Sequence, residues 1–187
     1  MRGQVGMNTF KADIEEIRRR ARQKMEDGAV TASYKADKDK VIEVLNEVLA
    51  TEVVCTLRYK NHYYMAQGIH SESVAAEFLE HATEEQLHAD MVADRIAELG
   101  GNPNFSPEGL ATRSHAEYKE CDRLEDMIRE DLVAERIAVS TYSEIVRWLA
   151  NEDVTTRRLM EQILAKEEEH ADDLAKLLVR IGTREAH

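Results

Sequence analysis

Four stretches of the sequence, each about 25 to 30 residues long, carry apolar side chains at steps of three and four residues. This spacing predicts amphipathic helices, because residues three and four apart lie on one helical face. Near the middle of every stretch that face also carries a glutamate, followed in two stretches by a histidine three residues later. A buried ionisable side chain is costly unless a partner compensates it, so these positions constrain both the fold and its chemistry.

The layout of the stretches predicts an all-α protein. The expected helices cover roughly residues 39–67, 71–100, 120–150 and 153–181. Short turns separate the first helix from the second and the third from the fourth, whereas the segment GNPNFSPEGLATRSHAE, which contains both prolines, makes a longer connection. This arrangement indicates an antiparallel four-helix bundle with one long crossover. The length of the crossover leaves open which way the third helix runs.

The bundle is expected to occupy residues 39–182, preceded by an extension over residues 1–38 and followed by a tail over residues 183–187. Within the extension, about residues 9–27 are predicted to form a short amphipathic helix. Its apolar face would consist of Phe10, Ile14, Ile17, Ala21 and Met25.

The four inward glutamates are predicted to lie at one level of the bundle. The midpoint between Glu52 and Glu85 falls at the Gly68 turn, and the midpoint between Glu135 and Glu167 falls at the Asn151 turn. Residues equally far from a turn face each other in an antiparallel hairpin, and at about 1.5 Å per residue both pairs lie roughly 25 Å from their turns. Two histidines share these faces three residues after a glutamate, in Glu85-x-x-His88 and Glu167-x-x-His170.

Six such side chains in a bundle core favour a pair of metal ions. Two divalent cations would neutralise four glutamates while both histidines stay uncharged, whereas without metal some carboxylates must take up protons and the bundle should loosen. Oxygen and imidazole donors without thiolate suit iron, manganese or zinc. Glu85 and Glu167 are the expected bridging ligands, since each stands one helical turn from its histidine. Buried ion pairing is the alternative, but no basic residue lies on the inward faces to provide it.

Four further side chains are expected near this site. Tyr59 and Tyr142 each follow an inward glutamate by seven residues, so they either pack in the core or act as hydrogen-bond donors or redox-active phenols. His81, one turn before Glu85, is a candidate accessory ligand or gate, and Asp131, one turn before Glu135, a candidate for orienting a ligand imidazole.

The composition restricts the partners and the compartment. The formal net charge of −12 disfavours nucleic-acid binding. Cys55 and Cys121 stand alone rather than in CxxC pairs, which excludes a rubredoxin-type centre. No signal peptide and no apolar run of about 18 residues is found, so we expect a cytoplasmic protein without a membrane span.

The chain resembles the ferritin-like superfamily, and bacterioferritin most of all. The segments LNEVLATEVVCTLRYKNHYYMAQG, EEQLHADMVADRIAELGGNPNF and KEEEHADDLAKLL are similar to the first, second and fourth helices of bacterioferritin. The resemblance covers about residues 40–181 and implies a ferroxidase centre that oxidises Fe(II) with O₂ or H₂O₂. It assigns two iron ions per subunit to the ligands Glu52, Glu85, His88, Glu135, Glu167 and His170.

Two departures from bacterioferritin bear on assembly and cofactors. Gln86 stands where bacterioferritin carries a haem-ligating methionine, so haem is not expected. The chain after Ile181 is too short for a fifth helix. Together with the extra N-terminal segment, this is more similar to the Dps-like ferritins with a bacterioferritin-type site and implies a shell of twelve subunits.

Three rival functions stay open at this stage. A diiron oxygenase such as demethoxyubiquinone hydroxylase uses the same ligand pattern, although the sequence shows no exposed apolar helix face for a membrane substrate. A rubrerythrin-like peroxide reductase is a second rival, and it is disfavoured by the missing rubredoxin cysteines. A non-enzymatic structural shell, stabilised by metal or protecting DNA, is the third.

Overall fold

The computed structural model describes residues 11–67 and 71–184, with side-chain burial up to residue 181. The chain divides into two compact units, residues 1–34 and residues 35–187. Within the described residues every regular element is helical, which confirms the all-α prediction. The division after residue 34 lies four residues before the predicted end of the extension. None of the described helices is long and apolar enough to cross a membrane.

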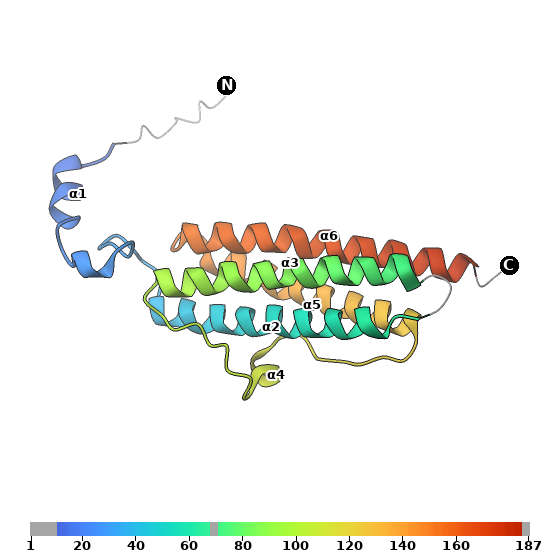
Figure 1. Cartoon of the computed structure of the whole chain (residues 1–187). Coiled ribbons are helices and arrows are strands. Elements are labelled where there is room, and N and C mark those ends of the chain that lie inside the picture. Colours follow the sequence, from blue (N-terminus) through green and yellow to red (C-terminus); the bar gives the residue numbers. More distant parts are fainter. Residues whose placement is uncertain (1–10, 68–70, 185–187) are drawn as a thin grey trace, which may run out of the picture. The chain divides into compact units, whose positions relative to one another are not determined.

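The second unit is a bundle of four long helices (Figure 1). These are α2 (Lys38–Met65), α3 (Ser71–Glu98), α5 (Leu124–Leu149) and α6 (Val154–Arg184). α2 packs chiefly against α3 and α5 against α6, while contacts of α3 with α6 and of α2 with α5 close the bundle. The crossover travels the length of the bundle, so α5 starts at the end where α2 finishes and every contacting pair is antiparallel. The structure thus decides the direction that the crossover length left open.

Local chemistry explains where the helices end. Asp37 caps α2 by accepting a hydrogen bond from the Lys40 amide at 3.2 Å. α3 stops at Glu98, and Gly100 follows with φ of +79°. A Cβ atom on Gly101 would lie 2.8 Å from Ile42 Cγ2, so only glycine fits between the end of α3 and α2.

Three predicted boundaries differ from the structure. The third long helix begins at Leu124 rather than near residue 120, and α6 continues through Gly182 to Arg184 instead of ending at that glycine. The crossover also contains a short helix, α4 (Leu110–Arg113), which was not predicted. Glycine permits a helix end but does not impose one, because helical packing can continue past it.

The N-terminal unit corrects the prediction of a helix over residues 9–27. Within the described residues it contains only α1 (Ile14–Arg20) and a 3-10 turn, η1 (Met25–Asp27), and residues 9 and 10 lie outside them. Asp13 caps α1, and Lys24 adopts a left-handed backbone conformation, with φ of +47°, directly before η1. Ile14, Ile17 and Met25 are all exposed, so the expected apolar face is not buried within the described part of the chain.

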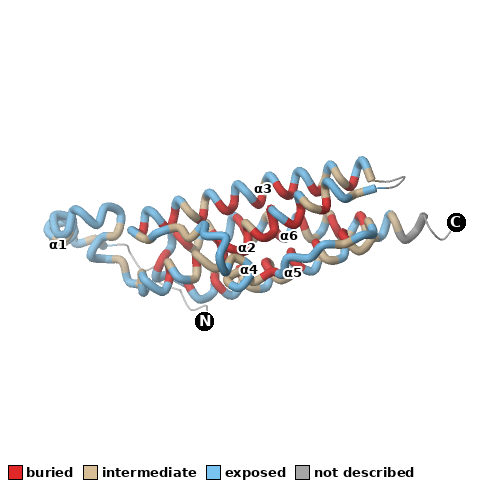
Figure 2. The backbone as a smooth tube through the Cα atoms, turned by 60° about the horizontal axis from the view of Figure 1, so that its bottom comes forward, coloured by how far each residue is buried: buried red, intermediate tan, exposed pale blue. Residues whose placement is uncertain are grey.

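The core follows the inward faces of the four long helices, where the buried residues gather (Figure 2). Leu45 and Leu49 of α2, Phe78 of α3, Ile128 of α5 and Ile163 of α6 are at most 1% exposed. Burying a side chain of this size contributes about 1.5–3 kcal/mol, so packing of these faces supplies most of the driving force for the bundle.

Two buried arginines tie the helices together, and the inward-face analysis missed both. Arg58 donates to Asp131 at 2.8 Å and to the Glu117 carbonyl of the crossover at 2.8 Å. Arg95 donates to Thr156 at 2.8 Å and to Asp153, the residue before α6. These arginines flank the inward faces, and neither one is paired with the four central glutamates in the described structure.

Candidate metal centre

All six predicted ligands meet inside the bundle. Each long helix contributes at least one of them, and every one is at most 5% exposed. The six are Glu52 on α2, Glu85 and His88 on α3, Glu135 on α5, and Glu167 and His170 on α6. Glu168 and Glu169, their sequence neighbours, point to solvent as helical periodicity requires.

The donors separate into two overlapping clusters. Glu52 and His88 join Glu85 and Glu167 in one, and Glu135 and His170 join the same two glutamates in the other. Within each cluster the donor atoms lie within 4.8 Å of one another. Two carboxylates shared between two otherwise separate donor sets are the arrangement expected of ligands that bridge a pair of ions.

Each histidine presents Nδ1 to the carboxylates. His88 Nδ1 lies 2.9 Å from Glu167 Oε1 and 3.4 Å from Glu52 Oε2. His170 Nδ1 lies 3.2 Å from Glu85 Oε1 and 3.8 Å from Glu167 Oε2. The donor atoms therefore surround common points instead of forming isolated pairs.

Several donor atoms are buried without a hydrogen-bonding partner in the described structure. They are Glu52 Oε2, His88 Nδ1, Glu135 Oε2 and Glu167 Oε1. His88 Nδ1 and Glu167 Oε1 are close, but their orientation does not form a hydrogen bond. Because an orphaned buried polar atom costs about 1–3 kcal/mol, one such atom from each long helix, distributed over the two clusters, fits a pair of cations that these atoms would bind.

Without metal, protons balance the charges of the site. Burial, together with the charge of Glu85, raises the pKa of both Glu52 and Glu167 well above the usual range. Burial and the charge of Glu85 also raise the pKa of Glu135, to about 7. This agrees with the expectation that carboxylates of a metal-free site take up protons.

Glu85 and the histidines depart from that expectation. Burial raises the pKa of Glu85, but hydrogen bonding with His170 and His88 outweighs burial and lowers it overall. Burial lowers the pKa of both histidines, yet the surrounding carboxylates raise that of His88 to about 10 and that of His170 to about 9. In the metal-free protein the imidazolium groups thus supply the positive charge that cations would bring.

Both tyrosines hydrogen-bond to glutamates of the site. Tyr59 of α2 donates to Glu135 Oε1 of α5, and Tyr142 of α5 donates to Glu52 Oε1 of α2. In each glutamate the tyrosine occupies Oε1, and Oε2 is the orphaned atom. The two phenols therefore hold the carboxylates of Glu52 and Glu135 so that Oε2 of each is turned to the centre.

His81 and Asp131 have different outcomes. His81 lies beside the centre, with its ring stacked on His170 at a centroid distance of 4.0 Å and its Nδ1 3.2 Å from Tyr59 Oη. Asp131 instead accepts hydrogen bonds from Arg58 and from His62 Nδ1, each at 2.8 Å. It has no hydrogen bond to His88 or His170 in the described structure, so the idea that it orients a ligand imidazole is wrong for these two histidines.

Glu84 is a contact that sequence reasoning missed. Its Oε2 lies 2.6 Å from His170 Nε2, and Lys166 pairs with its other oxygen at 3.2 Å. A carboxylate on the outer nitrogen fixes the tautomer and ring orientation of a ligand histidine. The only available signal was its place directly before Glu85, where helical geometry puts it at the edge of the inward face.

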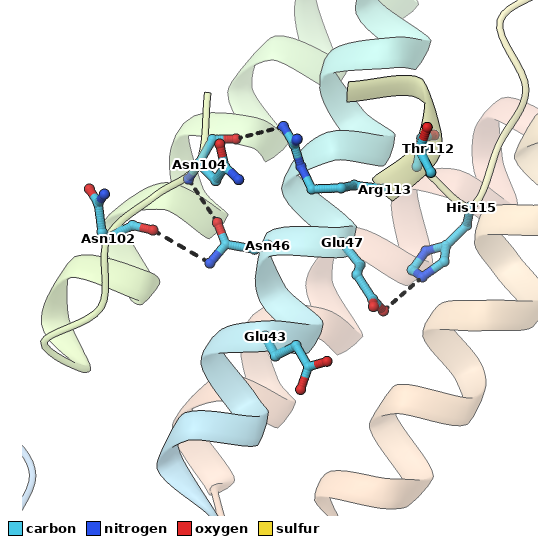
Figure 3. A pocket seen from close by; sticks show the side chains of 9 residues that line it. Glu43, Asn46, Glu47, Asn102, Asn104, Thr112, Arg113 and His115 are labelled. Carbon is cyan, nitrogen blue, oxygen red and sulfur yellow. Dashed lines mark hydrogen bonds and ion pairs between the residues drawn. The ribbon is translucent and has the colours of Figure 1, made fainter. Parts of the chain in front are cut away.

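A surface cavity of about 790 Å³ lies elsewhere, between α2 and the crossover. In it the Asn46 side chain holds the crossover through the Asn104 amide at 2.7 Å, and His115 lies 3.4 Å from Glu47 (Figure 3). None of the six donors lines it, so it is a separate polar groove that fixes the crossover to α2.

Comparison with known proteins agrees with this geometry. The profile of the ferritin-like domain matches residues 42–183. The bacterioferritin of Desulfovibrio desulfuricans is 31% identical over 134 residues, which cover 71% of each chain. Its solved structure, described as containing a diiron site, has a TM-score of 0.69 at 28% identity and covers 78% of this chain and 82% of that one.

Two further relatives show the range of similar proteins. A dodecameric thioferritin from Bacteroides fragilis, a bacterioferritin-related protein, has a TM-score of 0.78 at 32% identity, covering 81% of this chain and 92% of that one. A nutrient stress-induced DNA-binding protein from Nostoc is 32% identical over 148 residues, covering 75% of this chain and 78% of the relative.

Proposed function

Because the chain belongs to the ferritin-like family, we propose that it is a ferroxidase that stores and detoxifies iron. It oxidises Fe(II) with O₂ or H₂O₂ at an intrasubunit dinuclear site and deposits ferric mineral in an oligomeric shell. The observation that carries the proposal is the pair of buried donor clusters that share Glu85 and Glu167. Iron is the expected metal, and manganese or zinc also suit these donors.

The side chains of the site have distinct tasks. Glu52 and His88 hold one Fe(II), Glu135 and His170 hold the other, and Glu85 and Glu167 serve both. Each Fe(II) gives up one electron on oxidation, so a bound pair supplies the two electrons that convert H₂O₂ to water or O₂ to H₂O₂. Tyr59 and Tyr142 keep Glu135 and Glu52 in place through hydrogen bonds, and Glu84 orients His170.

Protons must leave when Fe(II) binds. The raised pKa values of His88 and His170 mean that both imidazoles are charged in the metal-free site at neutral pH. A metal ligand must be the neutral imidazole, so each histidine releases a proton as its Nδ1 becomes a donor atom. Glu84 stays paired with Nε2 of His170 after this release and keeps the imidazole ring aligned.

Self-association into a shell is supported by the exposed surface. Large apolar side chains are exposed on all four bundle helices, among them Leu57, Tyr64, Leu79, Leu87, Val133, Trp148, Val154 and Val179. Such residues are buried when subunits assemble. A twelve-subunit shell is proposed by analogy with the dodecameric relative.

We also expect a cytoplasmic protein that does not bind nucleic acid at physiological salt. The formal net charge of −12 opposes binding to phosphates. The similarity to a DNA-binding relative makes a mobility-shift assay informative. A shift with duplex DNA at physiological salt would contradict this expectation and favour a DNA-protecting role.

The test of the proposed function is an Fe(II) titration of the purified protein in air, combined with sizing. Storage predicts a large assembly in which iron uptake continues far beyond two ions per chain, as ferric absorbance in a soluble particle. Saturation at two ions in a small oligomer, with O₂ consumption that needs an organic substrate, would instead identify a diiron oxygenase.

Ligand variants connect that activity to the site. Under anaerobic conditions E52Q should lose one of two tight Fe(II) ions, because Glu52 belongs to one donor cluster only. E167Q should weaken both, because Glu167 belongs to both clusters. E168Q is the matched control, since its side chain is exposed one residue away. Equal stoichiometry in E167Q and E168Q would refute the assignment.

A further inference from the structure

A third group of donor atoms lies next to the centre, between α3 and α6. Glu77, His81 and Asp173 offer one ligand atom each within 4.8 Å of one another. Glu77 and Asp173 are half-buried, whereas His81 is 2% exposed. The group therefore reaches from the accessible surface of the bundle to its interior.

His81 belongs to two donor groups. Besides its group with Glu77 and Asp173, it forms a buried one with Glu135 and His170 of the dinuclear centre, again within 4.8 Å. Its ring stacks on the His170 ring with an interplanar angle of 19°. One imidazole thus stands between the partly exposed acids and the second donor cluster of the centre.

The hydrogen bonds around His81 determine which nitrogen carries its lone pair. Tyr59 donates its hydroxyl proton to Glu135, so its oxygen is left to accept the proton of His81 Nδ1 at 3.2 Å. The unprotonated Nε2 then points toward Glu77 Oε1, 3.7 Å away, and has no hydrogen-bonding partner among the described residues. A lone pair and a carboxylate oxygen that face each other across this distance offer two donor atoms to one cation.

We propose that Glu77, His81 and Asp173 form a third divalent-cation site, through which Fe(II) passes to the Glu135 and His170 side of the centre. This inference rests on the proposed function. The ion is first bound by the two carboxylates, then by His81 Nε2, and moves inward as Glu135 and His170 replace the outer ligands. Oxygen and imidazole donors of this kind suit Fe(II).

Basic residues near the site leave it accessible to cations. Lys176 reaches Asp173 at 3.1 Å, but its side chain is 53% exposed, so a cation can displace this ion pair at little cost. Glu77 has an electrostatic interaction with Arg180, while Asp173 and Glu80 add negative charge around it. The local balance is acidic, which attracts cations to the outer end of the route.

The test is equilibrium binding of Co²⁺, a redox-stable substitute for Fe(II), to the full-length protein. The wild type should bind two ions tightly and a third more weakly. The double variant E77Q/D173N should bind the third at least about tenfold more weakly while the first two are unchanged. D94N/E168Q removes the same charge from exposed positions on the same two helices, away from the three donors, and should titrate like the wild type.

A second variant and a rate measurement address His81 directly. H81F retains an aromatic ring against His170 but lacks the donor nitrogen, so it should also lose the third Co²⁺ ion. In stopped-flow mixing with two Fe(II) per chain, E77Q/D173N and H81F should both fill the centre several-fold more slowly than D94N/E168Q. The final amount of iron oxidised in this first turnover should be the same.

The outcomes separate this inference from the proposed function. A wild type that binds no pair of tight ions would refute the dinuclear centre itself. If two ions bind tightly, a third ion that persists in E77Q/D173N, or is lost equally in D94N/E168Q, would overturn the third site. Unchanged filling rates in both E77Q/D173N and H81F would overturn the route.

Discussion

Replacing Glu167 by glutamine is predicted to have opposite effects on stability in the metal-free and metal-loaded protein. Glu167 is 1% exposed, and burial beside three other glutamates raises its pKa well above the usual range. Glutamine has nearly the same shape and is neutral without taking up a proton, whereas Glu167 must be protonated in the metal-free site. The substitution therefore removes an electrostatic cost from the metal-free site and a ligand from both cation positions.

The expected magnitudes follow from these two effects. Keeping a buried carboxylate protonated costs about 1.4 kcal/mol for each unit by which its pKa is raised, so its removal should stabilise the metal-free protein by roughly 2 kcal/mol. A gain of about 2 kcal/mol corresponds to a rise in Tm of about 4–8 °C for a chain of this size. At a metal concentration 100 times Kd, each wild-type position adds about 2.7 kcal/mol, or about 5 kcal/mol for two. If E167Q weakens metal binding at each position about 100-fold, most of that gain is lost, and in the presence of metal the wild type becomes the more stable protein by about 2–3 kcal/mol.

The assay is thermal unfolding followed by circular dichroism, at fixed protein concentration, with chelator or with excess Co²⁺. E168Q should match the wild type within about 0.5 kcal/mol in both conditions, because Glu168 is exposed. The reasoning fails if E167Q is destabilised equally with and without metal. That result would mean that Glu167 stabilises the bundle through protein contacts rather than through cations.

Three other perturbations follow from the same contacts. The pKa of His88 is raised to about 10 and that of His170 to about 9, so the metal-free protein should be most stable below pH 6.5 and should lose stability as the pH rises to 10. Thermal unfolding in the presence of chelator at a series of pH values measures this. A Tm that does not change with pH would contradict it. Asp131→Ala removes the ion-pair partner of buried Arg58 and should lower the free energy of unfolding, measured in urea, by about 3–5 kcal/mol. A smaller loss of stability in the double variant R58M/D131L would confirm that the unpaired charge is the cause. Glu84→Ala should weaken Co²⁺ binding about 10–100-fold by calorimetry, whereas an unchanged Kd would exclude a role in orienting His170.

Helical periodicity and short turns made the centre predictable from sequence. Glu52 and Glu85 stand at equal distances from one turn, and Glu135 and Glu167 from another, so each pair must be level if its hairpin forms. The 3.6-residue repeat also fixes which of three consecutive glutamates faces inward, and Glu167 alone is buried. These relations depend on backbone geometry that the local sequence dictates, and they hold whatever the side chains do in detail.

Only the tertiary structure decided the contacts at the edges of the inward faces. Whether Asp131 meets a ligand histidine or Arg58, and whether Glu84 reaches His170, depends on how each helix is rotated against its neighbours. Long flexible side chains at such positions have several partners within reach, and periodicity does not choose among them. The same holds for α1, whose apolar residues are exposed in the described structure because a helical face is buried only where another surface meets it.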